Sequence, residues 1–326
     1  MELWDFQQKA KSDLYRLFKS NILKVVLVAP TGSGKTVMSS SIITDAVARN
    51  RKVLFVVHRD ELAKQAAQTL AEFGIMTGFI IANIKPTPLA KVQITSVQTM
   101  GRRDPLEIAE GFDLIVFDEA HITAWSTAGK LLLGKENTFI LGLTATPWRL
   151  SKYQEMGDLF DGIVHAPMPS ELIEKGFLAK PKYYSLSKPD LTGVRLGSDG
   201  DYRESDLNIA CNTPSTILNL VTNWKEYGNN QPTIIFGVSV SHAQNIAESF
   251  NNAGIPADFV TGETSKNDRK TIFNNLRTGQ IKILTSCDVL SEGFDYKGVG
   301  CVILARPTKS KAKYFQQLGR GLRSDK

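Results

Sequence analysis

The sequence predicts an α/β protein with two tandem domains, each a parallel sheet flanked by helices. Three observations lead to this fold class: runs rich in Val, Ile and Leu alternate with helical patterns, a glycine-rich loop follows an early run, and a polar stretch separates two similar halves. Runs that are apolar throughout indicate strands buried on both faces, as in a parallel sheet between helical layers. A length of 326 residues is typical of two ordinary domains.

The elements of the first half follow one another in a regular order. Residues 1–20 place apolar side chains at helical spacing and predict a covering helix. Further helices are predicted at residues 36–49 and 60–73, and strands at residues 25–29, 52–57, 78–82, 92–95, 113–117 and 138–143. Residues 151–180 lose strand character, with prolines at positions 167, 169 and 181 as breaks. We assign residues 1–180 to the first domain.

A polar region precedes the second half. Residues 187–213 are rich in Gly, Asp, Ser and Asn, and the run Leu196-Gly-Ser-Asp-Gly-Asp201 could suggest a calcium loop. Its spacing does not match an EF-hand, so we interpret residues 181–215 as a connector and the start of the second domain. Residues 216–326 form that domain, with strands predicted at residues 233–237, 257–260, 281–285 and 300–305 and helices at residues 242–253, 267–276 and 310–321.

The chain is organised around the loop Ala29-Pro-Thr-Gly-Ser-Gly-Lys-Thr36, which lies between a predicted strand and a predicted helix. The backbone N–H groups of such a turn and the positive end of the helix dipole bind phosphate. We expect Lys35 to reach the β/γ-phosphates and the Thr36 hydroxyl to bind Mg²⁺, although Ala29 stands where the general pattern has glycine. The predicted ATP-binding residues of the loop are Thr31, Gly32, Ser33, Gly34, Lys35 and Thr36.

A pair of adjacent acids, Asp118 and Glu119, follows another apolar run. A strand that delivers two acids to the sheet edge beside a phosphate loop suits a Walker B element. We expect Asp118 to hold Mg²⁺, directly or through water, and Glu119 to orient and deprotonate the attacking water. An exposed acidic turn is the simpler alternative if the pair is considered alone.

Arginines stand at the end of the second half, in Gln316-Gln-Leu-Gly-Arg-Gly-Leu-Arg323. Arg320 and Arg323 are three residues apart, and we expect them to point the same way from the final helix. Guanidinium groups that reach a γ-phosphate stabilise the charge of phosphoryl transfer. A solvated basic helix end is the alternative.

Composition bounds the function class. Hydrophobic residues make up 42% of the chain and charged residues 22%, as in soluble globular proteins. No apolar run approaches the roughly 20 residues of a membrane span, and the acidic, aromatic N-terminus is unlike a secretory signal. The three cysteines and four histidines are scattered, which argues against a zinc site and favours a reducing cytoplasm. A net charge of +6 permits a polyanionic partner.

Taken in order, these motifs resemble those of the superfamily 2 helicases and translocases over essentially the whole chain. The resemblance is to the DEAH form, in Asp118-Glu-Ala-His121, and within it to phage-type and repair-type DNA helicases related to type III restriction helicase subunits. It implies two RecA-like domains with a cleft between them. The matching segments are Ala29–Thr36 (motif I), Val57–Leu62 (Ia), Asp118–His121 (II), Thr144–Thr146 (III), Ile234–Ser241 (IV), Thr285–Asp295 (V) and Gln316–Arg323 (VI).

The resemblance also implies roles for single residues. Gln7 is expected to read adenine, although Trp4 replaces the usual arginine of that motif. Gly293 and Asp295 are expected to approach ATP from the second domain. His121, Thr144, Thr146 and Gln316 would couple the ATP site to the bound strand. The residues expected to face nucleic acid, mostly its phosphates, are Arg59, Thr95, Gln98, Thr99, Ser239 and Thr285.

The expected function is therefore an ATP-dependent helicase or translocase in the cytoplasm of a bacterial or phage-infected cell, monomeric and acting on DNA rather than on a membrane. An RNA helicase is the first alternative. A motor or clamp subunit of a restriction or repair complex, without unwinding of its own, is the second. The family usually continues past motif VI with another strand, so we expect either a truncated chain or one that works with an accessory protein.

Overall fold

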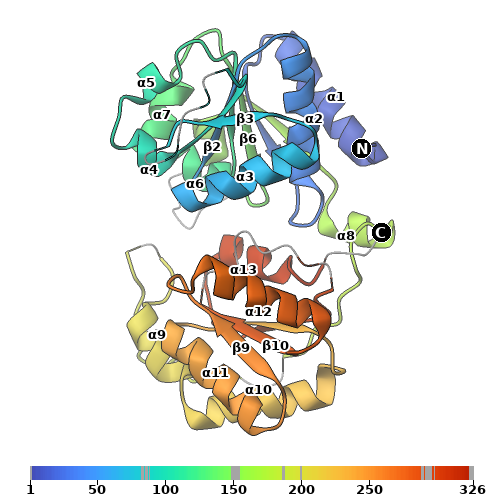
Figure 1. The fold of residues 1–326 in the computed structure, drawn as a ribbon, viewed down its shortest axis with the longest axis vertical. Helices are drawn as coiled ribbons and strands as arrows, with labels where there is room; N and C mark the ends of the chain where they lie inside the picture. Colours follow the sequence, from blue (N-terminus) through green and yellow to red (C-terminus); the bar gives the residue numbers. More distant parts are fainter. Residues whose placement is uncertain are drawn as a thin grey trace. The chain divides into compact units, whose positions relative to one another are not determined.

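The computed structural model of the chain (Figure 1) describes residues 2–81, 84, 87, 89–147, 155–185, 188–198, 200–287, 290, 296 and 298–322. It divides into two compact units, Met1–Leu172 and Ile173–Lys326. Each unit is a parallel sheet with helices packed against it, so the predicted α/β class with two parallel sheets is confirmed. Within the described residues, no helix has the length and apolar character that crossing a membrane requires.

The first unit contains a seven-stranded sheet in the order β3-β4-β2-β5-β6-β1-β7, and every described pairing is parallel. Its strands are β1 (Lys24–Val28), β2 (Val53–Val57), β3 (Thr77–Phe79), β4 (Val92–Ser96), β5 (Leu114–Phe117), β6 (Phe139–Thr144) and β7 (Gly162–His165). Its helices are α1 (Asp5–Lys19), α2 (Lys35–Ala48), α3 (Asp60–Glu72), α4 (Val97–Met100), α5 (Pro105–Ile108), α6 (Ala120–Thr123), α7 (Thr127–Leu133), the 3-10 helix η1 (Met156–Asp158) and α8 (Pro169–Glu174), whose last two residues fall in the second unit.

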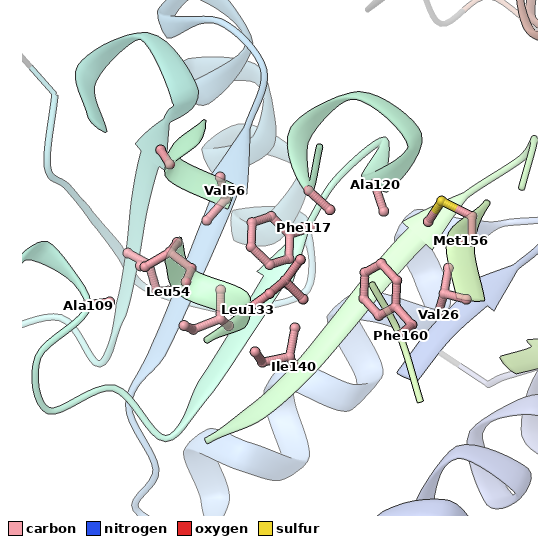
Figure 2. Packing of buried hydrophobic residues seen from close by; sticks show 14 of the residues in the cluster. Val26, Leu54, Val56, Ala109, Phe117, Ala120, Leu133, Ile140, Met156 and Phe160 are labelled. Atoms are coloured by element: carbon pink, nitrogen blue, oxygen red, sulfur yellow. The ribbon is translucent and has the colours of Figure 1, made fainter. Parts of the chain in front are cut away.

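The core on one face of this sheet is continuous across its central strands. Figure 2 shows alternate strand residues, among them Val56, Phe117 and Ile140, meeting Leu133 of α7. Phe160 closes the far side of the cluster and lies so near β6 that a Cβ added at Gly142 would sit 2.6 Å from its Cζ. Because the opposite strand residues are buried as well, the strands read as unbroken apolar runs.

The strand β7 corrects the expectation that residues 151–180 contain no strand. It pairs with β1 at the edge of the sheet, with Val28 opposite His165. Only Val164 of its four residues is buried, and Ile163 is 48% exposed. An edge strand this short buries too little apolar surface to leave a sequence pattern, so the sequence gives it no signal.

The second unit contains a four-stranded parallel sheet in the order β11-β8-β10-β9. Residues of β8 alternate between two cores: Ile234 and Phe236 pack against the cluster that includes Leu276, and Ile235 packs against that of Trp224. Both faces are therefore buried. The elements are α9 (Glu204–Cys211), α10 (Pro214–Tyr227), β8 (Thr233–Phe236), α11 (Val240–Asn252), β9 (Ala257–Val260), α12 (Lys266–Thr278), β10 (Ile283–Ser286), β11 (Cys301–Leu304) and α13 (Lys311–Leu318).

The final helix is shorter than expected. Prediction placed it at residues 310–321 with Arg320 and Arg323 on it, but α13 ends at Leu318. Gly319 and Arg320 continue as a turn, in which the Arg320 N–H donates to the Gln317 carbonyl at 3.2 Å. Two glycines in three residues, at positions 319 and 321, remove the helix preference that would extend it. Arg323 lies outside the described residues.

A buried histidine lies at the start of α11. His242 is fully buried, and its Nδ1 accepts a hydrogen bond from the Val238 N–H at 3.2 Å. Burial penalises the charged imidazolium and lowers the pKa of His242 to about 4. The folded second unit therefore holds this histidine neutral over the whole physiological range.

We expect the free energy of unfolding to fall by about 2 kcal/mol between pH 7 and pH 5 through His242 alone. In that window the unfolded chain binds a proton near the ordinary histidine pKa of about 6.5, whereas the folded chain does not. Urea unfolding of the wild type and of His242→Asn at both pH values measures this, since the asparagine carbonyl can still accept from Val238. An equal loss of stability in both chains would contradict the prediction.

Candidate nucleotide site and nucleic-acid interface

The phosphate-binding loop begins where β1 ends in the middle of the sheet. The Ala29 N–H donates to the Thr144 carbonyl of the neighbouring β6 at 2.9 Å, which fixes the point at which the chain leaves the sheet. Gly32 and Gly34 then adopt φ of 85° and 80°, a region that side chains with a Cβ rarely enter. The turn ends at the first residue of α2, Lys35, whose Nζ donates to the Ala29 carbonyl at 3.2 Å. The chain thus forms the strand, loop and helix arrangement expected from the sequence.

Gln7 of α1 holds this loop from the side. It is only 2% exposed, and its Nε2 donates to the Ser33 carbonyl at 2.9 Å while its Oε1 accepts from the Trp4 N–H at 3.0 Å. A Cβ added at Gly34 would lie 2.5 Å from the same Nε2. The structure therefore reveals a bracing contact that the sequence did not predict, and the adenine-reading role stays a prediction.

A pocket of about 270 Å³ lies along α2, from Val37 to Asp45. Val37 is common to both places, because it lines the pocket and lies 3.6 Å from the position of an added Gly34 Cβ. The lining residues are Leu3, Val37, Ser41, Thr44, Asp45, Glu72 and Phe73.

The acid pair stands at the end of β5, two strands from β1 with β6 between them. The Asp118 N–H donates to the Val56 carbonyl at 2.9 Å, and Asp118 Oδ1 accepts from the Glu119 N–H at 3.1 Å. Glu119 turns the chain sharply with φ 45° and ψ 58°. The Thr123 hydroxyl donates to the Asp118 carbonyl at 2.8 Å and so ties the turn to α6.

His121 and Thr144 connect the acid pair to β6. The Thr144 hydroxyl donates to the Thr146 carbonyl at 2.9 Å and lies 2.9 Å from His121 Nδ1. Since the single hydroxyl proton is used on Thr146, His121 Nδ1 must carry the proton of its bond to Thr144. The same Nδ1 lies 3.4 Å from Glu119 Oε2, a buried oxygen that makes no hydrogen bond to any described residue. The structure thus brings together three of the residues expected to couple the ATP site to the bound strand, His121, Thr144 and Thr146, and places the expected base Glu119 beside them.

Three of the six side chains expected to face nucleic acid do not reach the surface. Thr95, Thr99 and Thr285 are 0%, 3% and 0% exposed. Their hydroxyls donate to the Ile80 carbonyl at 3.0 Å, to Asp60 Oδ1 at 3.1 Å and to the Ala243 carbonyl at 2.6 Å, respectively. The structure does not support a direct side-chain contact for these three, because each hydroxyl bonds a protein acceptor instead.

The other expected contacts remain accessible. Arg59 and Gln98 are exposed beyond the ends of the neighbouring strands β2 and β4. Ser239 is half-buried: its hydroxyl accepts from the His242 N–H at 3.0 Å as the cap of α11 and donates to Asn208 Oδ1 at 2.5 Å. Arg102 and Arg103 are exposed directly after α4, near Gln98, and were not predicted. Two adjacent arginines that follow a strand-end cluster are the signal that could have found them.

The residues expected to act from the second unit are described only in part. Gln316 is half-buried on α13, and Arg320 is half-buried in the turn after it. Gly293, Asp295 and Arg323 lie outside the described residues. Among the residues that the structure does describe, no three His, Cys, Asp or Glu side chains gather as a metal site. Thr36, which is exposed, and Asp118 remain the candidate ligands.

Two protein-family models match the chain: "Type III restriction enzyme, res subunit" over residues 1–149 and "Helicase conserved C-terminal domain" over residues 213–325. A 51.5 kDa protein of a Lactococcus phage (isolate 7-9) is 33% identical over 299 residues, 91% of this chain and 62% of that protein. The DNA 3'-5' translocase XPB2 of Sulfurisphaera tokodaii is 27% identical over 341 residues, 91% of this chain and 74% of that protein.

Solved structures agree in fold. The ATP-dependent Type ISP restriction-modification enzyme LlaBIII bound to DNA aligns with a TM-score of 0.70 at 18% identity, covering 100% of this chain and 27% of that one. The chain spans between 49% and 62% of the length of several phage and yeast relatives.

We expect Gly34→Ala to weaken ATP binding by about tenfold or more, because its Cβ would displace the Gln7 side chain and distort the loop. Gly74→Ala is the matched control, since Gly74 also has positive φ (73°) but an added Cβ would meet no described atom within 4 Å. Titration with a fluorescent ATP analogue measures both. Equal affinity of the two variants would show that the contact with Gln7 does not matter for the loop.

Proposed function

The chain belongs to the superfamily 2 helicases, with relatives among restriction-enzyme helicase subunits, and on that premise we propose that it is an ATP-dependent motor that moves along DNA. One observation carries the proposal most directly. The phosphate-binding loop and the acid pair belong to the same sheet and are tied to each other through Thr144, which bonds Ala29 by its carbonyl and His121 by its hydroxyl.

The residues present fit a nucleoside triphosphate. The loop places two positive-φ glycines, 32 and 34, before a helix N-terminus, the arrangement that presents N–H groups to phosphate. The Lys35 ammonium is part-buried beside the loop, and its bond to the Ala29 carbonyl is one that phosphate oxygens can replace. The pocket next to Val37 can hold the base, near Gln7.

The proposed division of labour follows from these positions. Lys35 would bind the β/γ-phosphates, and Thr36 and Asp118 would hold Mg²⁺. Glu119 orients and deprotonates the attacking water, and its buried, unbonded Oε2 is an acceptor ready for that task. ATP supplies the bond whose hydrolysis drives the motor, and Mg²⁺ neutralises phosphate charge. We assign Gln316, Arg320 and Arg323 to the same reaction, with Gly293 and Asp295 as further nucleotide contacts.

The proposed contacts with nucleic acid lie beyond the carboxyl ends of β2 and β4 in the first sheet. Arg59, Gln98, Arg102 and Arg103 are exposed there and would meet the phosphate backbone. Such contacts give weak sequence preference and strong salt dependence. DNA is favoured because XPB2 is named a DNA translocase and LlaBIII was solved bound to DNA.

A motor subunit of a restriction-type complex is the second candidate, favoured by the family model over residues 1–149. In that case, duplex DNA would stimulate ATP hydrolysis while forked DNA would not be unwound by the chain alone.

Steady-state ATP hydrolysis with single-stranded DNA, duplex DNA, forked DNA and single-stranded RNA tests the proposal. We expect stimulation by DNA that weakens as salt rises. Stimulation by RNA alone would make an RNA helicase the better assignment. No turnover with any nucleic acid would count against a motor and favour a clamp.

We expect Glu119→Gln to bind ATP with unchanged affinity but to hydrolyse it about 10²–10⁴-fold more slowly, because the amide cannot accept the proton of the attacking water. Lys35→Ala should lose about a hundredfold in turnover, because it removes a phosphate-binding charge. Glu136→Gln and Lys91→Ala, both at exposed positions, are the matched controls. Normal turnover by Glu119→Gln would exclude Glu119 as the base.

A further inference from the structure

The segment of residues 191–212, interpreted from the sequence as a connector, is a folded part of the second unit. We call it the brace. Its apolar side chains, including Leu207 and Cys211 of α9, bury themselves against Val238 at the end of β8. The glycine-rich run closes into a small loop through an antiparallel bridge between Leu196 and Tyr202. These contacts fix the position of the segment on the unit, so the segment can hold in place the residues that it contacts.

The acid of the glycine-rich run is buried and fully engaged. Asp201 is 4% exposed, and its Oδ1 accepts from the backbone N–H groups of Lys309 at 2.7 Å and Tyr202 at 3.0 Å. Its Oδ2 accepts from the Thr308 hydroxyl at 2.7 Å and lies 3.8 Å from Lys313 Nζ. Since protein donors occupy both oxygens, a calcium role for Asp201 is not supported.

Burial alone would raise the pKa of Asp201, but the bonds from Lys309, Thr308 and Tyr202 and the Lys313 charge outweigh it and lower the pKa. Asp201 is therefore ionised at neutral pH. A buried carboxylate stabilises a fold less than an apolar residue of the same size does, but its directional hydrogen bonds fix the positions of its partners.

Three partners of Asp201, namely Thr308, Lys309 and Lys313, lie at the start of α13. The Thr308 hydroxyl also accepts from the Ser310 N–H at 3.0 Å, and the Ser310 hydroxyl caps the helix by accepting from the Lys313 N–H at 3.3 Å. Lys313 itself lies in the first turn. The Asp201 carboxylate thus holds the Lys309 backbone in the loop before α13, the Thr308 side chain and Lys313 in the first turn of the helix.

The same helix leads into the turn of Gly319 and Arg320, which we call the arginine turn. α13 has eight residues, carries Gln316 and is followed by Gly319 and then Arg320. A helix of this length spans only about 12 Å and moves as a rigid body, so a shift at its start is passed to its end. A misplacement of about 1 Å at a reacting group is enough to cost a large factor in rate.

Other contacts fasten the brace to the rest of the unit. Asn208 Oδ1 accepts from the Ser239 hydroxyl at 2.5 Å, and Asn212 Oδ1 accepts from Asn245 Nδ2 at 2.9 Å. Both contacts reach α11 or its cap, far along the chain from α13. Asp201 is therefore anchored by a segment that is itself held at a second point.

We infer that Asp201 is a positioning residue for ATP hydrolysis: it holds the start of α13 so that Gln316 and Arg320 stand where the reaction requires them. The catalytic part of this inference rests on the proposed function, whereas the structural part does not. Asp201 touches no nucleotide in this scheme and acts only through α13.

Asp201→Asn is the decisive variant, because it keeps the shape but replaces one acceptor oxygen with an NH₂ group that cannot accept. We expect kcat for nucleic-acid-stimulated ATP hydrolysis to fall by about ten- to a hundredfold, with KM for ATP and binding of an ATP analogue within about twofold of the wild type. Hydrogen exchange at the Lys309 amide should become faster in Asp201→Ala, which removes the oxygen that accepts from this amide. Asp190→Asn is the matched control, an exposed acid bonded to Thr192 in the same region.

A double-mutant cycle with Arg320→Ala separates positioning from general destabilisation. If Asp201 acts through the arginine turn, Asp201→Asn lowers kcat much less in the Arg320→Ala background than in the wild type. A merely structural role predicts equal factors in both backgrounds. If Asp201→Asn does not fold, Thr308→Val takes its place, since it removes the hydroxyl that donates to Asp201 and accepts from the Ser310 N–H but leaves the carboxylate paired with Lys309 and Lys313.

The outcomes are distinct. A wild type without nucleic-acid-stimulated ATP hydrolysis would overturn the proposed function and the catalytic part of the inference together. A wild type that hydrolyses ATP, with Asp201→Asn as active as Asp190→Asn, would overturn the inference alone. Unchanged exchange at the Lys309 amide in Asp201→Ala would overturn its structural part.

Discussion

The candidate site depends on the way Thr144 is held at the end of β6. Its backbone carbonyl accepts a hydrogen bond from Ala29, the first residue of the phosphate-binding loop. Its hydroxyl is hydrogen-bonded to His121 of α6 and to Thr146 in the turn that follows β6. Three segments that are far apart in the chain thus meet in one buried residue. In a parallel sheet all strands deliver their carboxyl ends to the same edge, so such a junction needs no special topology. A displacement of any one of the three segments is therefore expected to displace the other two.

The fold makes this junction rigid through burial on both sheet faces. Alternate residues of the central strands belong to separate cores, and close contacts such as that of Phe160 over Gly142 leave little free volume. The second unit repeats the principle with four described strands, whose alternate residues pack into two apolar clusters. Hydrogen bonds of Asp201, Asn208 and Asn212 connect the brace to the start of α13, to the cap of α11 and to Asn245 within α11, respectively.

Much of this could be predicted from the sequence. The fold class and the family are confirmed, because long apolar runs and ordered motifs are strong signals that tertiary context rarely overrides. What could not be predicted shares a physical cause: it depends on which way a side chain turns. Thr95 and Thr285 read as polar residues at strand ends, yet their hydroxyls face inward. The edge strand β7 and the early end of α13 lack enough buried surface or helix preference to show in the pattern. Asp201 looked like part of a connector because its partners Thr308 and Lys309 lie more than a hundred residues away.

The backbone of Glu119 has a consequence for how this chain can evolve. The other described non-glycine residues with positive φ are all asparagines, the side chain that tolerates this region best, and Glu119 is the exception. A residue held there costs on the order of 1–3 kcal/mol of folding stability. Replacement by Gly or Asn would return part of that stability while removing the carboxylate. Selection for thermal stability alone should therefore favour the replacement of Glu119 and yield inactive chains. Only selection for ATP hydrolysis keeps the glutamate at this position.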